Sequence, residues 1–206
     1  MRRAFLLAIA ALVLAAPAGC FPGLPARRDW TFLVYMAADN NLNYYARLDL
    51  AEMAAVGSSP EVNVLVQLDQ ATPGVSSARM LVKRGETADF TDLGETNTGR
   101  EEELRNFLVW AARNFPARRY ALVLWDHGSG VWDPEGARTS PNPASGETAF
   151  IRAVAYDDAA GYDALTTEEY TRAIRDAEQA AGFHLDVLCF DACLMQMAEV
   201  AGQLAA

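Results

Sequence analysis

The chain contains little cysteine and little positive charge, and each shortage argues against a class of protein. Its 206 residues include three cysteines, too few for a small disulfide-stabilised scaffold. Lysine and arginine number 17 against 27 aspartates and glutamates, which gives a formal net charge of -10. Nucleic-acid binding is not expected, because neutralising phosphates requires a basic surface. The acidic balance suits basic substrates or cationic partners, or serves solubility alone.

No hydrophobic run is long enough for a comfortable membrane span, which needs about 20 apolar residues. The longest run is at the N-terminus, where two arginines precede thirteen apolar residues, 4–16. A short basic cap followed by such a run is typical of a secretory signal. Residues 17–20 resemble the cleavage box of bacterial lipoproteins, in which Cys20 would become the lipid-bearing first residue. The alternative is ordinary signal-peptidase cleavage near Ala18, with Cys20 an unpaired thiol.

These features divide the chain into three parts. Residues 1–19 are predicted to be a lipoprotein-type signal peptide, residues 20–29 a tether, and residues 30–206 a folded domain. Hydrophobic residues make up 51% and charged residues 21% of the chain, a globular composition that excludes disorder. We expect an exported protein of the bacterial cell envelope, attached to a membrane through a lipid on Cys20, or secreted if Cys20 is not modified.

Buried strands alternate with amphipathic helices along the domain. Nearly continuous apolar runs, typical of strands buried on both faces, occupy residues 30–36, 62–68, 78–83, 120–125 and 185–190. Helices are predicted at residues 42–56, after capping boxes at Thr98 and Thr166, and at residues 194–204. The second and third strands should form an antiparallel hairpin, and residues 133–149 a long exposed loop. The alternation predicts an α/β sandwich with a mainly parallel sheet.

Two of these strands end in reactive residues. Ligands of open α/β sheets bind beyond the carboxyl ends of the strands. There, His127 follows the fourth strand and Cys193 follows the fifth. The other histidine, His184, precedes the fifth strand at the wrong edge, and Cys189 lies inside it, where a thiol is usually an inert core residue. His127 and Cys193 are therefore the pair predicted for a cysteine hydrolase.

The neighbours of this pair favour the same chemistry. Cys193 precedes a predicted helix, whose amino-terminal dipole would favour the thiolate. Gly128 has no side chain to block a substrate carbonyl, so the backbone amides of Gly128 and Cys193 are candidates for an oxyanion hole. A metal-dependent hydrolase using Asp39, Asp126 and His127 is an alternative. These residues lack the repeated spacing of a metal site, so no metal ligands are assigned.

Three motifs resemble the clostripain family of cysteine peptidases: WDHGSG at residues 125–130, FDACLM at 190–195 and YMAADNNL at 35–42. The resemblance implies a caspase-like three-layer α/β/α sandwich and cleavage of proteins or peptides after Arg or Lys by His127 and Cys193. It implies that Asp191 helps to bind the basic side chain of the substrate, and capping of the following helix is a compatible role. It also implies that residues 30–206 are the N-terminal part of a longer domain.

The family also cuts itself in a loop between the histidine and cysteine strands. The corresponding segment here is residues 133–158, and it offers Arg138 and Arg152 as cut sites. Exposed loop arginines are often merely solvated, so both interpretations remain open.

No cofactor is required by a cysteine–histidine pair, but the enzyme that gives the family its name is calcium-dependent. The candidate calcium ligands, or alternatively solvated turn carboxylates, are Asp157, Asp158 and Asp163. The second functional hypothesis is a non-catalytic envelope binding module on the same scaffold, in which the pair is a relic.

Overall fold

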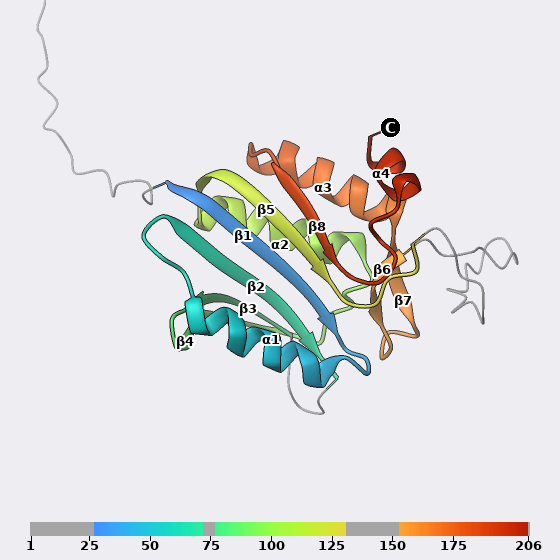
Figure 1. Cartoon of the computed structure of the whole chain (residues 1–206), viewed down its shortest axis with the longest axis horizontal. Coiled ribbons are helices and arrows are strands. Elements are labelled where there is room, and N and C mark those ends of the chain that lie inside the picture. The colour runs from blue at the N-terminus through green and yellow to red at the C-terminus, as the bar shows by residue number, and fades with distance from the viewer. Residues whose placement is uncertain (1–26, 72–76, 131–152, 206) are drawn as a thin grey trace, which may run out of the picture.

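A computed structural model describes residues 27–71, 77–130 and 153–205 of the chain (Figure 1). Its strands are β1 (Arg28–Ala38), β2 (Val62–Gln70), β3 (Ser77–Lys83), β4 (Glu86–Gly94), β5 (Ala117–Trp125), β6 (Ala153–Asp157), β7 (Asp163–Thr166) and β8 (Val187–Asp191). Its helices are α1 (Asn43–Val56), α2 (Glu101–Asn114), α3 (Thr167–Ala181) and α4 (Ala198–Leu204).

The main sheet has six strands in the order β4-β3-β2-β1-β5-β8, and β6 and β7 form a separate pair. Strand β1 runs parallel to β2 and β5, and β5 runs parallel to β8. The antiparallel pairing of β2 with β3 confirms the predicted hairpin. The carboxyl ends of the four parallel strands therefore meet at one edge of the sheet, here called the carboxyl edge. The opposite edge is called the amino edge.

Helices cover both faces of the sheet, so the predicted α/β/α sandwich with a mainly parallel sheet is confirmed (Figure 1). On one face, α2 and α3 pack against inward side chains such as Leu33 and Leu122, which are fully buried. On the other face, α1 packs against side chains such as Val66 and Met36. Each such burial contributes roughly 1.5–3 kcal/mol, which fixes the strands that carry the site residues.

Only one of the two predicted capping boxes forms. The Thr166 hydroxyl accepts a hydrogen bond from the Glu169 amide, and the Glu169 carboxylate accepts one from the Thr166 amide, as predicted. The box at Thr98 was wrong, because α2 begins after Arg100 without a side-chain cap. The Thr98 amide instead donates to Asp157, 59 residues away, over 3.0 Å. A long-range bond thus replaces the local cap.

Three strands were not predicted, and one of them overturns part of the expected loop. All five residues of β6 are buried, although the segment 133–158 was interpreted as a loop. Strand β6 has only five residues and belongs to a two-stranded sheet with β7, so its apolar residues are too few to predict a strand from the sequence. The residues of β4 are mostly exposed, as suits an edge strand.

Strand β8 is the outermost strand of the main sheet on the side opposite β4. Two predictions about this strand and the segment after it are wrong. Leu188 and Phe190 pack into the core on the side of α3, whereas Cys189 points to the opposite face and is exposed rather than buried. The last helix begins at Ala198, not at residue 194, because residues 192–194 form a turn after the strand and residues 195–197 are irregular. No helix among the described residues has the length and apolar character needed to cross a membrane.

Candidate active site at the carboxyl edge

The segments that carry His127 and Cys193 lie side by side at the carboxyl edge. Trp125 and Asp191 are direct partners in the parallel register of β5 and β8. The Asp126 amide donates to the Asp191 carbonyl over 3.2 Å, which continues the pairing one step beyond the strands. A Cβ added to Gly128 would lie 2.5 Å from the Cys193 carbonyl oxygen. The structure thus brings the two predicted segments into backbone contact.

Cys193 sits in a strained turn rather than at the start of a helix. Leu194, the next residue, has φ of 63°, a conformation that costs a residue with a side chain on the order of 1 kcal/mol. Helix α4 begins only at Ala198, so the predicted contribution of its dipole to Cys193 is not supported. The Cys193 side chain is exposed at the carboxyl edge. Strained residues are often found next to reactive groups, and this turn presents Cys193 to solvent.

Asp191 is the last residue of β8 and does not cap the following helix, since Met197 holds the cap position of α4. The alternative capping role considered for Asp191 is therefore wrong. Its side chain belongs to the exposed face of the strand, two residues before Cys193. An anionic group is thereby available to a cationic ligand at this edge.

Asp126 fixes the position of the histidine segment. The side chain is buried, and its carboxylate accepts hydrogen bonds from Asn40 Nδ2 (2.7 Å) and from the Tyr156 amide. Burial raises the pKa of Asp126 to about 7, against the opposing effect of these bonds. One carboxylate thus ties the end of β5 to the turn after β1 and to β6. The next residue, His127, places Nε2 2.7 Å from Asn41 Oδ1.

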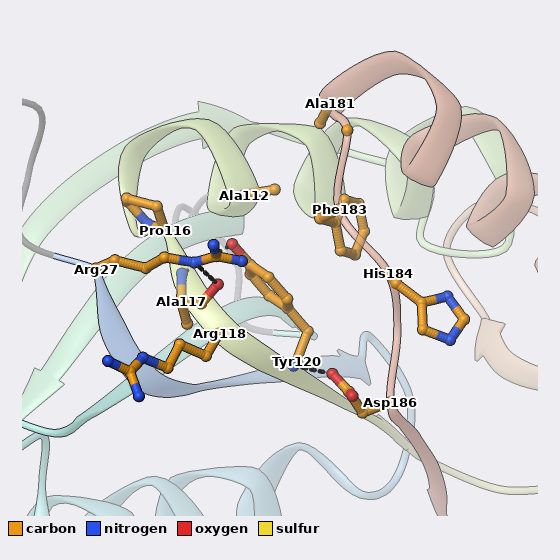
Figure 2. A pocket seen from close by; sticks show the side chains of 11 residues that line it. Arg27, Ala112, Pro116, Ala117, Arg118, Tyr120, Ala181, Phe183, His184 and Asp186 are labelled. Atoms are coloured by element: carbon orange, nitrogen blue, oxygen red, sulfur yellow. Dashed lines mark hydrogen bonds between the residues drawn. The ribbon is translucent and has the colours of Figure 1, made fainter.

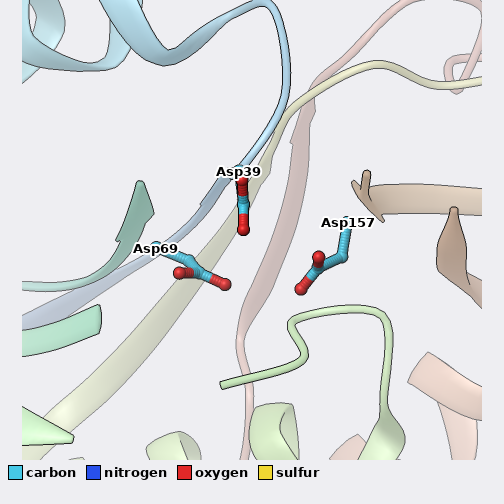
Figure 3. Close-up of side chains that lie close together, drawn as sticks. All are labelled: Asp39, Asp69 and Asp157. Atoms are coloured by element: carbon cyan, nitrogen blue, oxygen red, sulfur yellow. The ribbon is translucent and has the colours of Figure 1, made fainter. Parts of the chain in front are cut away.

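A second group of carboxylates lies at the same edge. Asp39 follows β1, Asp69 is the next-to-last residue of β2 and Asp157 ends β6. Figure 3 shows their side chains directed toward one another. One oxygen of each lies within 4.8 Å of the others. All three residues are buried, and the most exposed of them, Asp39, is 7% exposed. Three buried oxygen donors that close together are the chemistry that a hard divalent cation prefers.

This carboxylate cluster was only partly foreseen. The sequence groups Asp157 with Asp158 and Asp163 as candidate calcium ligands, and Asp39 with Asp126 and His127 as an alternative metal-dependent site. The structure groups Asp39 and Asp157 with Asp69 instead. Asp69 was missed, although a carboxylate at the end of an apolar strand is a usable signal.

Burial and mutual repulsion shift the acidity of the carboxylate cluster. Burial, with repulsion from Asp157, raises the pKa of Asp39 to about 6, and burial raises the pKa of Asp69 to about 7. Burial also raises the pKa of Asp157. All three shifts favour the protonated form in the folded state, so the ionised cluster opposes folding at neutral pH.

We predict that the protein becomes less stable as the pH rises from 5 to 8 in the absence of divalent cations. Between roughly pH 4 and 7 the folded state binds more protons than the unfolded state, so the free energy of unfolding falls as pH rises. We expect the melting temperature to drop by at least about 5 °C, measured by calorimetry in chelator. Asp69→Asn should flatten this slope, and Asp176→Asn, at an exposed site on α3, should not. A melting temperature that rises between pH 5 and 8 would contradict the expectation.

A pocket of about 760 Å³ lies at the amino edge, away from the residues described above (Figure 2). Arg27 Nε donates to the Ala117 carbonyl over 2.7 Å, and the Tyr120 amide donates to Asp186 Oδ2. His184 lines the pocket, as its predicted place before β8 requires, and its Nδ1 lies 2.9 Å from Glu178 Oε1. The pocket contains no thiol, so it offers no nucleophile of the predicted kind.

Three predicted positions lie outside the described residues. They are the lipidation site Cys20 and the two candidate self-cleavage sites, Arg138 and Arg152.

Known proteins match the chain in sequence and in fold. A sequence model of the Clostripain family matches residues 34–206. The chain is 28% identical over 206 aligned residues to clostripain from Hathewaya histolytica, covering 84% of this chain and 35% of that protein. The chain therefore spans about a third of the length of this curated relative.

Solved structures share the fold, and two of them are described next. One is a secreted C11 cysteine protease from Bacteroides thetaiotaomicron in complex with an irreversible peptide inhibitor. It matches with a TM-score of 0.63 and 25% identity, covering 86% of this chain and 46% of that chain. The other is an inactive zymogen C11 protease from Parabacteroides distasonis, with a TM-score of 0.58 and 24% identity over 88% of this chain and 47% of that chain. At this identity the second match supports the fold alone.

Proposed function

The chain belongs to the clostripain family of cysteine peptidases, and from that premise we propose that it is a cysteine endopeptidase that cleaves after Arg or Lys. The observation that carries the proposal is the backbone contact between Gly128 and Cys193, because it places the two family motifs against each other. Cys193 is the proposed nucleophile and His127 the proposed base. Asp191, exposed at the end of β8, is the proposed partner of the basic substrate side chain.

The proposed reaction proceeds through a thioester. The Cys193 thiol gives its proton to His127, and the sulfur attacks the carbonyl carbon of the substrate. The backbone amides of Gly128 and Cys193 would stabilise the resulting oxyanion, a contact worth about 3 kcal/mol per donor. When the C–N bond breaks, His127 returns the proton to the leaving amine. Water then hydrolyses the thioester and restores the thiol.

A comparison of the two described cysteines tests this proposal against a non-catalytic binding module. Cys189 and Cys193 are both exposed, so access alone does not distinguish them. We predict that iodoacetamide modifies Cys193 at least about tenfold faster, because a base that takes the thiol proton generates the reactive thiolate. Mass spectrometry of the two cysteine peptides measures the ratio, and His127→Ala should bring it close to one. Equal modification rates of Cys189 and Cys193 in the unaltered chain would favour the non-catalytic binding module.

Export and lipid attachment through Cys20 are also proposed. The support is the basic cap, the apolar run of residues 4–16 and the lipoprotein-like box at residues 17–20. The solved relative from Bacteroides thetaiotaomicron is described as secreted, which agrees with an exported chain.

We further propose that Asp39, Asp69 and Asp157 bind calcium. Calcium takes six to eight oxygen ligands at about 2.3–2.6 Å, and the three carboxylates present their oxygens to a common point (Figure 3). Burial is the main cause of their raised pKa values, and repulsion from neighbouring carboxylates adds to it; a divalent cation would compensate this buried negative charge. It would also tie β6 to the ends of β1 and β2, beside the candidate site, without entering the reaction.

Calcium is expected to stabilise the protein by binding the folded state only. At a concentration about 100 times its dissociation constant, a ligand adds about 2.7 kcal/mol, so the melting temperature should rise by roughly 5–10 °C relative to chelator. Differential scanning fluorimetry measures this shift. Asp69→Asn should abolish the rise, and Asp176→Asn should retain it. An unchanged melting temperature at millimolar calcium would contradict the assignment.

A further inference from the structure

The His127 imidazole has a side-chain partner outside the proposed catalytic pair. Its Nε2 lies 2.7 Å from Asn41 Oδ1, within normal hydrogen-bond distance. Asn41 belongs to the turn between β1 and α1, 86 residues earlier in the chain. The contact therefore joins the ends of two neighbouring parallel strands, β1 and β5, at the carboxyl edge.

The turn that carries Asn41 is fixed by hydrogen bonds of the preceding residue, Asn40. Asn40 Nδ2 donates to the Ala37 carbonyl, to Asp126 Oδ1 and to the Tyr156 carbonyl, and Asn40 Oδ1 accepts from the Leu42 amide over 2.8 Å. Asp126 is also the residue before His127. One buried hydrogen bond, Asn40 to Asp126 at 2.7 Å, thus fixes the backbones of Asn41 and His127 relative to each other.

The chemistry of the contact selects one form of the imidazole. A neutral imidazole carries its proton on one ring nitrogen and its lone pair on the other. An amide oxygen can only accept, so a bond to Asn41 Oδ1 requires the proton on Nε2. The lone pair then resides on Nδ1, the nitrogen that would take the thiol proton.

We propose that Asn41 is a positioning residue that holds His127 in the Nε2-protonated form, the form whose lone pair on Nδ1 can take the thiol proton. This inference rests on the proposed function only for the identity of the base. Asn41 acts on the imidazole and touches no reacting atom. Its role is that of the group which orients the base in other nucleophile–histidine sites.

Nitrogen NMR of the imidazoles tests the inference without any substrate. The chain has two histidines, so His184, which pairs with Glu178, is an internal reference. In the neutral imidazole the two ring nitrogens differ strongly in chemical shift, and this identifies which one is protonated. We expect His127 to show the Nε2-protonated form in the unaltered chain, a mixture in Asn41→Ala and the original form in Asn41→Asp, which keeps an acceptor oxygen. The His184 signals should not change.

Measurements of peptidase activity provide a second test of the role of Asn41. Asn41→Ala should lower kcat/KM by about ten- to a hundredfold through misplacement of the base, and Asn41→Asp should recover most of the loss. Asn114→Ala, at an exposed asparagine of α2 whose side chain donates to the Trp110 carbonyl, is the matched control and should have no effect. The inference would be overturned if His127 were protonated on Nδ1 in the unaltered chain. It would also be overturned if the nitrogen spectrum of Asn41→Ala were identical to that of the unaltered chain. Inactivity of the unaltered chain with the expected spectra would defeat the proposed peptidase function and leave the positioning contact supported.

Discussion

Cys193→Ala is expected to abolish hydrolysis of an arginyl reporter peptide, with a loss on the order of 10⁴-fold or more in kcat/KM. The reason is that no other described residue at the carboxyl edge offers a thiol beside His127. Cys193 is exposed in a turn, so its truncation removes little buried surface, and the melting temperature should stay within about 1 °C of the original. Activity and stability together separate loss of chemistry from loss of fold.

Cys189→Ala is the matched control. It removes a thiol that is also exposed and lies four residues earlier on β8, and hydrolysis should be unchanged. Full activity in Cys193→Ala would exclude Cys193 as the nucleophile.

Gly128→Ala is expected to have the second largest effect. The added methyl group would lie 2.5 Å from the Cys193 carbonyl and 2.7 Å from Met195 Cγ, and the carbonyl cannot yield without moving the Cys193 turn. We expect the free energy of unfolding to fall by about 1–3 kcal/mol through overpacking. Displacement of the nucleophile by a fraction of an ångström should lower kcat/KM by about a hundredfold. Urea denaturation and reporter hydrolysis measure the two effects.

Gly202→Ala provides the comparison for this substitution. Gly202 lies within α4, and a Cβ there would have no neighbour within 4 Å. Alanine should stabilise this helix slightly, by up to about 1 kcal/mol, and leave hydrolysis intact. Unchanged stability and activity in Gly128→Ala would show that the contact between the two motif segments is not required.

The parallel strands could be predicted because burial on both faces leaves a continuous apolar pattern. The apolar runs at residues 30–36 and 120–125 correctly predicted β1 and β5. Because His127 follows β5, its place at the carboxyl edge was predicted as well. The cap at Thr166 was predictable for a different reason, since both of its bonds lie within four residues. Local patterns therefore fixed the elements, and the parallel topology placed the candidate pair.

The remaining features depend on contacts between distant segments. Thr98 has the sequence of a helix cap but bonds to Asp157 instead, and this partner is known only from the fold. Asp69 comes close to Asp39 and Asp157 because three strands end together. Cys189 has the pattern of a core residue, and its exposure follows from the position of β8 at the edge of the sheet.

Strand β1 also sets how far the reactive residues stand from an anchored N-terminus. It starts at Arg28, so it includes the last two residues of the predicted tether, and its 11 residues end beside Asp39 at the carboxyl edge. At about 3.3 Å per residue, the strand measures roughly 36 Å, more than the thickness of a bilayer's hydrocarbon core. With the proposed lipid on Cys20, the tether would join the domain at the amino edge, and His127 and Cys193 would lie a full strand length away at the carboxyl edge.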